Sequence, residues 1–227
     1  TMCHWADYHW LGVRTDPAAP KHRGISLFIV DLKSPGITVR ELRTLHERTN
    51  EVFYDNVRVP KKNLVGEMNR GWYYIATALD YERNWEVGEA KSLFEDLVAF
   101  AKETKRNGKP LSQDPLVRSK LAELAIELEI TDLLAWRVAW MQVHEVIPNY
   151  EAAMVKVFGS ETDRRMAYAG MDILGLHCQL QKGSRYAPLE GFAEQWFRDS
   201  IRHVITRGTS EVMRNIVALR GLGLPRG

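Results

Sequence analysis

The chain has 227 residues and a net charge of +2, with 45% hydrophobic and 26% charged residues. These proportions are ordinary for a globular protein and exclude a disordered chain. Lysines and arginines are interleaved with aspartates and glutamates, so the sequence predicts no basic stripe for nucleic acid. No apolar run approaches the roughly 20 residues that a membrane-spanning helix needs, and no signal-peptide pattern is found, so no membrane partner is expected.

The cysteines and histidines give no pattern typical of a metal site. Cys3 and Cys178 lack CxxC spacing, which excludes a disulfide scaffold and a cysteine-based zinc site. The histidines lack HxxxH or HxH spacing. We therefore expect a cytoplasmic protein that binds no metal. Because Thr1 leads directly into an aromatic-rich run, we also expect further sequence to precede it.

The first part of the chain, residues 1 to about 68, is predicted to be β-structure. Its apolar runs have the length of strands and are separated by turn residues. The runs are found at 24–31, 37–42 and 52–54, and the last is followed by the turn dipeptide Asp55-Asn56. A unit of this size would bury little apolar surface alone.

From about Gly71 the hydrophobic period becomes helical. One long helix is expected from there to Asn107-Gly108. Further helices are expected from Asp114-Pro115 to about 144, from 148 to about 174, over about 188–204, and from Thr209-Ser210 to about Gly221. The predicted fold class is therefore an α+β fragment, in which a short antiparallel β segment over 1–68 precedes an up-and-down helical bundle over 69–227.

Glu82 is the most informative polar position in the helical part. It follows Leu79 by three residues and Ile75 by seven, which predicts a place on the apolar face of the first helix. A carboxylate facing a core is costly unless it is paired, and desolvation moves a carboxyl pKa toward the range of a general base. The alternatives are a structural ion pair, with Arg83 or with a neighbouring helix, and an exposed position.

A second candidate is the stretch Arg-Gly-Thr-Ser-Glu at 207–211. It is predicted to be a turn that leads into a helix N-terminus, where free N–H groups and the helix dipole attract anions. A plain Ser/Thr cap would give the same pattern. On its own the stretch therefore does not assign a ligand.

The order of these segments resembles the acyl-CoA dehydrogenase family over essentially the full length. Five stretches look like that family's strand-to-helix junction: 24–31, 34–37, 53–60 (Phe-Tyr-Asp-Asn-Val-Arg-Val-Pro), 64–67 and 71–72. Three others look like its closing signature: Arg198-Asp199, 208–216 (Gly-Thr-Ser-Glu-Val-Met-Arg-Asn-Ile) and 220–225. The resemblance implies the end of the family's middle β-domain over 1–68 and its C-terminal helical domain over 69–227.

The resemblance also implies a reaction, the FAD-dependent α,β-dehydrogenation of an acyl-CoA thioester. A carboxylate removes the α-proton while a hydride moves from the β-carbon to flavin N5. The family places this base at one of two positions. One of them is Arg207 here, and a guanidinium cannot act as a base at neutral pH. The other falls on Glu82, within Leu-Asp-Tyr-Glu-Arg at 79–83, so Glu82 is the predicted base.

Other site residues follow from the resemblance. The backbone N–H of Arg207 would donate to the thioester carbonyl, and Arg83 and Gly208 would contact the substrate. The implied FAD contacts come from five residues: Thr1, Thr209, Glu211, Arg106 and Gly175. The implied electron acceptor is an electron-transfer flavoprotein.

Three positions depart from the pattern with which a neighbouring subunit binds the flavin diphosphate and adenine. Thr104 replaces an arginine, Asp172 replaces a glutamine and Leu176 replaces a glycine. These exchanges disfavour a phosphate-bearing ligand and predict a hetero-oligomer in which a homologous subunit supplies the missing groups. The alternative is a homotetramer in which Lys105 and Arg106 substitute from shifted positions.

Three other functions stay open at this point. The chain could be a non-catalytic, flavin-supporting subunit of a heteromeric dehydrogenase, which an outward-facing Glu82 would favour. It could be an acyl-CoA oxidase, which transfers electrons to oxygen. It could also be a helical interaction module without chemistry. An acyl-CoA dehydrogenase is the function that the combined motifs favour.

Overall fold

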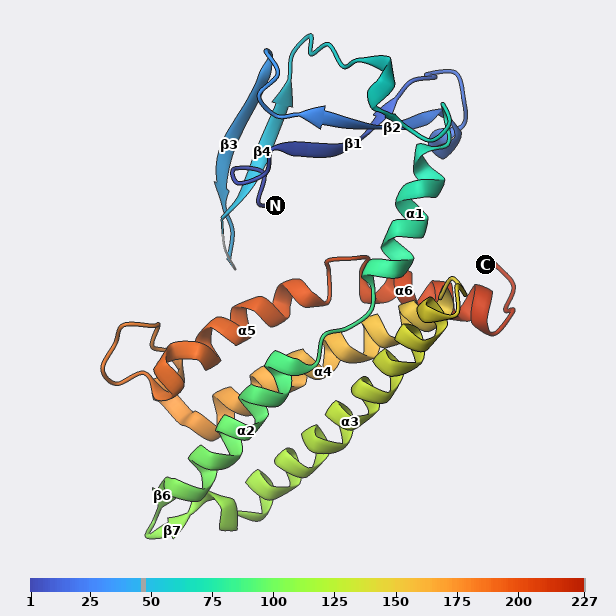
Figure 1. Cartoon of the computed structure of the whole chain (residues 1–227). Coiled ribbons are helices and arrows are strands. Elements are labelled where there is room, and N and C mark those ends of the chain that lie inside the picture. Colours follow the sequence, from blue (N-terminus) through green and yellow to red (C-terminus); the bar gives the residue numbers. More distant parts are fainter. Residues whose placement is uncertain (46–47, 227) are drawn as a thin grey trace. The chain divides into compact units, whose positions relative to one another are not determined.

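The computed structural model describes residues 1–45 and 48–226 and divides the chain into two compact units, Thr1–Leu79 and Asp80–Gly227. The first unit contains most of the strands and the second most of the helices (Figure 1). The predicted fold class, an antiparallel β segment followed by a helical region, is confirmed. Among the described residues, no helix combines the length and apolarity that crossing a bilayer requires.

The first unit contains two small antiparallel sheets. A three-stranded sheet has the order β1-β2-β5 and a two-stranded sheet pairs β3 with β4. The strands are β1 (Tyr8–Arg14), β2 (Ile25–Asp31), β3 (Ile37–Arg43), β4 (Arg48–Tyr54) and β5 (Leu64–Val65). The strands expected at 24–31 and 37–42 are confirmed. The sequence did not delimit β1, because its residues alternate between exposed and half-buried and form no apolar run.

The start of helix α1 (Gly71–Glu82) is fixed against the three-stranded sheet. A Cβ on Gly71 would lie 2.6 Å from the backbone carbon of Ser26, so only glycine allows this approach. The buried Ser26 hydroxyl also accepts a hydrogen bond from the backbone N–H of Asn69, at 2.7 Å. The turn that precedes α1 is therefore held to the sheet by backbone contact and by a satisfied buried polar group.

The single long helix expected from Gly71 to Asn107 is wrong. Helix α1 ends at Glu82, and α2 (Gly88–Glu103) begins only after a non-helical segment. Within that segment Arg83, Trp85 and Val87 are buried in alternation with more exposed residues. The break was not visible in the sequence because apolar residues continue at helical spacing on both sides of it.

The dipeptide Asn107-Gly108 does not end a helix either. Helix α2 ends four residues earlier, and a short hairpin follows it, β6 (Lys105–Arg106) paired with β7 (Lys109–Pro110). Asn107 and Gly108 have φ values of +54° and +80° and form its two-residue turn. Asn-Gly is the pair best suited to such a turn, because both central residues need positive φ.

The remaining helices agree with expectation. They are α3 (Pro115–Val143), α4 (Tyr150–Leu174), α5 (Phe192–His203) and α6 (Ser210–Ile216), which a π-helical turn extends over Val217–Gly221. Asp114 caps α3 by accepting from the Leu116 N–H at 2.9 Å. Thr209 caps α6 by accepting from the Val212 N–H at 3.4 Å. Both caps satisfy N–H groups that a helix leaves free at its first turn.

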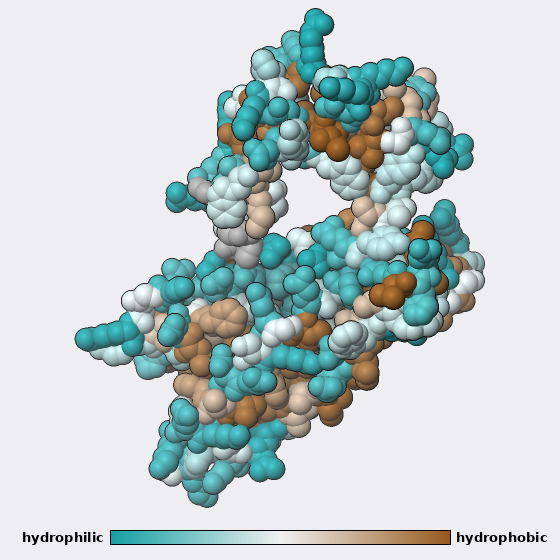
Figure 2. Space-filling model, viewed as in Figure 1, coloured by the Kyte–Doolittle hydropathy of each residue, from teal (hydrophilic) through white to brown (hydrophobic). Residues whose placement is uncertain are grey.

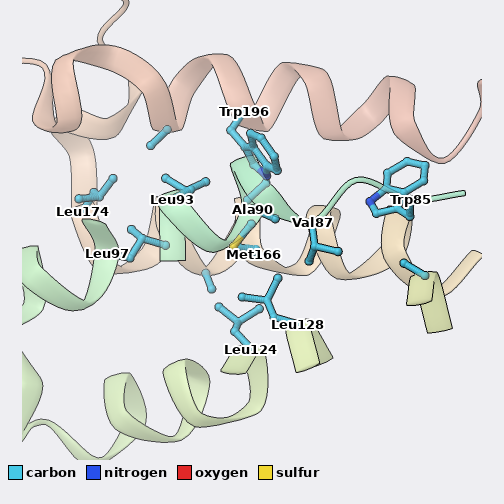
Figure 3. Packing of buried hydrophobic residues seen from close by; sticks show 14 of the residues in the cluster. Trp85, Val87, Ala90, Leu93, Leu97, Leu124, Leu128, Met166, Leu174 and Trp196 are labelled. Atoms are coloured by element: carbon cyan, nitrogen blue, oxygen red, sulfur yellow. The ribbon is translucent and has the colours of Figure 1, made fainter. Parts of the chain in front are cut away.

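One hydrophobic core joins the helices of the second unit (Figure 3). Each of four helices and the α1–α2 segment contributes side chains to it: Trp85 and Val87 from the segment, Leu93 and Leu97 from α2, Leu124 and Leu128 from α3, Met166 and Leu174 from α4, and Trp196 from α5. Because residues far apart in sequence share this core, the α1–α2 segment and helices α2, α3, α4 and α5 are held in fixed relation.

A matched pair of glycine substitutions in α4 tests this packing. A Cβ on Gly159 would lie 2.5 Å from the Trp85 ring, whereas one on Gly170 would lie 3.7 Å from the Leu97 methyls. Gly159→Ala is therefore expected to lower the free energy of unfolding by about 1–3 kcal/mol. Gly170→Ala should be neutral or raise it by up to about 1 kcal/mol. Denaturant unfolding followed by circular dichroism measures both, and equal effects would contradict the packing of Trp85 on α4.

Candidate functional site

Glu82 is the last residue of α1, and its side chain is 58% exposed within the chain. The expectation that it faces an apolar core is wrong, because the helix ends at this residue and does not continue into the bundle. Its Oε1 lies 3.6 Å from Nε of Arg207. The sequence left open an ion pair or an exposed position, and the structure shows features of both.

The buried carboxylate at this end of α1 is Asp80, which the sequence analysis did not select. Its Oδ1 accepts from Nη1 of Arg83 at 2.6 Å, and its Oδ2 accepts from Nδ2 of Asn149 at 3.0 Å. Burial raises the pKa of Asp80, while Asn149 and Arg83 act in the opposite direction. The i, i+3 spacing of Asp80 and Arg83 was the available signal, since such a pair meets on one helix face.

Arg83 connects α1 to the segment before α6. Its side chain is 9% exposed, and besides Asp80 it contacts the backbone carbonyl of Arg207, to which Nε donates at 3.0 Å. The predicted residues Glu82, Arg83 and Arg207 thus lie together although more than 120 positions separate the two segments. Hydrogen bonds from a charged donor to a buried acceptor are among the stronger ones in proteins.

The backbone at Arg207 and Gly208 has an unusual conformation. Both residues have positive φ, +58° and +103°. A Cβ on Gly208 would lie 2.4 Å from the Cε of Met213, so glycine is required there for both conformation and space. Within the described residues, the backbone N–H of Arg207 makes no hydrogen bond. It is therefore a free donor on the residue whose side chain pairs with Glu82.

Thr209 and Glu211, two of the predicted cofactor residues, lie at the start of α6. They line a cavity of about 400 Å³ together with basic and aromatic side chains of α4 and α6, namely Arg164, Arg165, Tyr168 and Arg214. Hydrogen bonds from its own backbone N–H and from the Thr209 hydroxyl lower the pKa of Glu211. This carboxylate is an acceptor for N–H and O–H donors and does not suit a phosphate.

Two other predicted cofactor residues of the helical unit lie away from α6. Arg106 is exposed on the β6–β7 hairpin, at the opposite end of this unit (Figure 1). Gly175 follows α4 with φ +72°, and a Cβ added there would meet nothing within 4 Å. Within one chain they do not join Thr209. Thr1 belongs to the first unit, where its hydroxyl accepts from that of Thr49 at 3.3 Å.

The three departures from the cross-subunit pattern also lie at the hairpin end of the unit. Thr104 is the C-cap of α2 and donates its N–H to the Phe100 carbonyl. Asp172 forms an ion pair with Lys120 of α3. Lys120 offsets part of the negative charge of Asp172, which was expected to repel a phosphate. The side chain of Leu176 is 84% exposed.

Lys156 is a buried cation of α4 that the sequence analysis did not select. Its side chain is fully buried, and Nζ has no hydrogen-bond partner among the described residues. Burial lowers the pKa of Lys156 to about 8. Glu161 and Glu211 raise this pKa, and Arg207 and Arg83 lower it, so the ammonium group interacts with the same charges as the site.

The titration of Lys156 predicts a pH-dependent stability. Below about pH 8 the lysine is charged in both states, and its burial is costly. Between about pH 8 and the ordinary lysine pKa of 10.5, Lys156 releases its proton in the folded state but keeps it in the unfolded state. The free energy of unfolding therefore rises with pH over this range. Lys156→Met is therefore expected to raise the free energy of unfolding by about 3 kcal/mol near neutral pH, with the gain shrinking toward about pH 10.

Denaturant unfolding over a pH series measures this gain. Lys102→Met, at an exposed position of α2, is the matched control and should give no pH-dependent gain. A destabilised Lys156→Met protein at neutral pH would mean that the ammonium group is satisfied in the folded protein.

Comparison with known proteins places this geometry in a family. The sequence model described as "Acyl-CoA dehydrogenase, C-terminal domain" matches residues 69–222. Acyl-CoA dehydrogenase FadE29 of Mycobacterium tuberculosis is 37% identical over 235 residues, an alignment that covers 100% of this chain and 59% of the relative. The chain thus spans about 59% of the length of that relative.

Solved structures agree over the whole chain. The ChsE4–ChsE5 complex from Mycobacterium tuberculosis superposes with a TM-score of 0.90 at 34% identity, covering 100% of this chain and 60% of that one. A structure titled "Tcur3481-Tcur3483 steroid ACAD" gives a TM-score of 0.90 at 36% identity, covering 98% and 58%. From the family match, the sequence identity and the shared fold, the chain belongs to the acyl-CoA dehydrogenase family.

Proposed function

We propose that the full-length protein is an FAD-dependent acyl-CoA dehydrogenase in which Glu82 removes the α-proton of an acyl-CoA thioester. The observation that carries this proposal is the Glu82 carboxylate, whose Oε1 lies 3.6 Å from Nε of Arg207. The backbone N–H of the same arginine makes no hydrogen bond among the described residues, and Arg83 holds its carbonyl in place. Residues 1–68 would be the end of the middle β-domain and 69–227 the C-terminal helical domain. We assign the protein to the cytoplasm because both cysteines are free thiols.

The two groups suit the two charges that develop in the reaction. Glu82 would take the α-proton from the substrate, and its exposed side chain leaves it accessible to a ligand. The Arg207 N–H would donate to the thioester oxygen, where enolate charge develops, a contribution of a few kcal/mol in comparable sites. Arg83 and Gly208 would shape the substrate contact by fixing the backbone at residue 207.

The residues near α6 fit a large polar cofactor. The Thr209 hydroxyl lines a cavity, the Ser210 hydroxyl is buried without a hydrogen-bond partner in the described chain, and Lys156 supplies an unpaired buried positive charge. We assign Thr209 and Glu211 to the binding of FAD, and Thr1 is likewise assigned a contact with this cofactor. When bound, FAD would accept the hydride from the β-carbon at N5, so that the α-proton and the hydride together leave a carbon–carbon double bond.

An apolar stripe on α3 supports assembly into an oligomer. Its members recur at three-, four- and seven-residue steps and are 60% exposed or more: Ile126, Leu133, Trp136, Trp140 and Val143. Hydrophobic residues are also seen among the hydrophilic surface of the helical unit in Figure 2. A contiguous apolar face of this kind marks a protein interface. We propose a tetramer, with an electron-transfer flavoprotein as the acceptor.

We further propose that this tetramer contains a homologous second subunit. Two relatives carry names that join two components, ChsE4–ChsE5 and Tcur3481–Tcur3483. Thr104 cannot supply the positive charge that the family pattern places at this position for the flavin diphosphate. The neighbouring Lys105 and Arg106 are exposed, and they could supply it in the alternative homotetramer. In either assembly Arg106 and Gly175 would contact a neighbouring subunit's FAD.

The name "steroid ACAD" of one relative leads us to propose that the substrate carries a bulky, ring-bearing acyl group.

A second candidate is a flavin-supporting subunit without its own turnover. The 58% exposure of Glu82 favours it, because a general base in a finished site is usually shielded from water. Substrate-dependent flavin bleaching distinguishes this subunit from a dehydrogenase. Oxygen consumption on addition of an acyl-CoA distinguishes an acyl-CoA oxidase from both.

Glu82→Gln in the full-length protein is expected to keep the fold and the flavin but to slow flavin bleaching by about 10²–10⁴-fold or more, because the amide cannot accept the α-proton. Anaerobic stopped-flow spectroscopy with a panel of acyl-CoAs measures the rate. Glu95→Gln, on the exposed face of α2, is the control and should bleach normally. Bleaching by the Glu82 variant at the parent rate would show that another group is the base.

The protein expressed alone should contain less than one FAD per chain after gel filtration. The loss of one charge-assisted contact to the flavin diphosphate weakens binding by about 1.5–3 kcal/mol, so the affinity for FAD should fall roughly tenfold or more. Thr104→Arg is expected to raise the flavin content, and co-expression with a homologous subunit should restore it fully. A stable homotetramer with one flavin per chain would favour the Lys105 and Arg106 alternative.

A further inference from the structure

A second cavity of the helical unit adjoins the Glu82–Arg207 pair, because Arg207 is one of its lining residues. Its volume is about 370 Å³, which is within the range of small-ligand sites. Trp85 and Trp196 line it with apolar surface, and His203, Thr206 and Arg207 with polar groups. The Arg207 guanidinium lies 5.5 Å from the centre of the Trp85 ring. Arg207 therefore belongs both to this cavity and to the pair with Glu82.

His203 is held rigidly in the cavity wall. Its Nδ1 lies 2.9 Å from Oδ2 of Asp163, whose side chain is 5% exposed. The rings of Trp85 and Trp196 pack edge-on against the imidazole, with centroid distances of 5.5 and 5.9 Å. Trp196 is itself fixed by a hydrogen bond from Nε1 to the Asp163 carbonyl, at 3.3 Å. The imidazole thus has one orientation.

Because Nδ1 of His203 is bound to Asp163, Nε2 is the ring nitrogen that remains for a ligand. An Nδ1–H that donates to a carboxylate leaves Nε2 of the neutral imidazole as an acceptor. Across the described residues, Nε2 makes no hydrogen bond, and His203 lines the cavity. Glu86 and Glu89 on the same wall are acceptors as well. Arg202 and Arg207 line the same cavity as donors. A hydroxyl group that enters this cavity therefore meets an acceptor at Nε2 and donors from the arginines, beside two indole rings.

We propose that His203 is a specificity-determining residue, positioned by Asp163, that accepts a hydrogen bond from a hydroxyl group on the acyl part of the substrate. The proposal rests on the proposed function, because it places the far part of the acyl group in the cavity next to Glu82. The indole rings would hold a bulky ring system, and Nε2 would select those that carry a hydroxyl. Sites built to hydrogen-bond a hydroxyl discriminate strongly against ligands that lack it.

Binding of two matched α,β-unsaturated CoA esters to the full-length flavoprotein tests this proposal by isothermal titration calorimetry. One ester is 3-cyclohexylacryloyl-CoA and the other bears a 4-hydroxyl on the ring. Being dehydrogenated already, they bind without turnover. The hydroxylated ester is expected to bind about tenfold more tightly. Equal affinities, or binding of neither ester, would overturn the proposal.

Two variants separate the recognition role from the packing role of His203. The amide group of asparagine lies where Nδ1 of histidine lies, so His203→Asn can keep the hydrogen bond to Asp163 but has no acceptor in place of Nε2. This variant should lose the tenfold preference for the hydroxylated ester. A glutamine amide matches Nε2, so His203→Gln should retain it. His22→Asn, an exposed histidine of the first unit, is the control. A preference that survives in His203→Asn would show that another group recognises the hydroxyl.

The corresponding saturated CoA esters distinguish a failure of this proposal from a failure of the proposed function. If they bleach the flavin equally well and both products bind equally, the protein is a dehydrogenase without this selectivity. If neither bleaches the flavin while the hydroxylated product still binds more tightly, the cavity is a selective site and the proposed reaction is wrong.

Discussion

The guanidinium of Arg83 is the interaction on which the site depends. It lies in a buried position between the carboxylate of Asp80 and the backbone carbonyl of Arg207, and so it joins the end of α1 to the segment before α6. Removing the Asp80 carboxylate would leave the buried guanidinium without its counter-charge, which is far more costly than losing an exposed ion pair. The backbone carbonyl of Arg207 thereby points toward Arg83. The same residue has a positive φ, so its backbone adopts the left-handed conformation at this point.

The break between α1 and α2 is a consequence of the same requirement. If the helix continued past Glu82, Arg83 and Trp85 would point to different sides, and they could not both enter the bundle as they do. The non-helical segment places the Trp85 ring against Gly159 of α4, at a distance that no larger residue would permit. The lost helical hydrogen bonds are offset by burial of Trp85 and Val87 in the shared core.

Charged and polar groups inside the helical unit are unevenly satisfied. Asp80 and Asp163 each have specific partners, so their burial is compensated. Lys156 has none among the described residues, although it interacts with the charges around Arg207. Natural proteins retain such costly groups mainly where they serve a site, since a hydrophobic residue of similar size would be more stable. The uncompensated charge and the proposed FAD contacts of Thr209 and Glu211 occur in the same part of the fold.

The sequence by itself determined the division into a β part and a helical part, the helices from Asp114 onward, the caps at Asp114 and Thr209, and the family. These depend on local periodicity, on side chains next to their own backbone, and on the joint order of motifs. It also singled out Glu82, Arg83 and the 207–211 stretch. Only the tertiary structure decided that Glu82 is exposed at a helix end, that Asp80 is the buried carboxylate, and that His203 lies between two tryptophans. The physical reason is that burial depends on which segments pack together. The apolar residues keep their helical spacing on both sides of the break between α1 and α2, whereas the packing of Trp85 on the distant Gly159 is a tertiary contact.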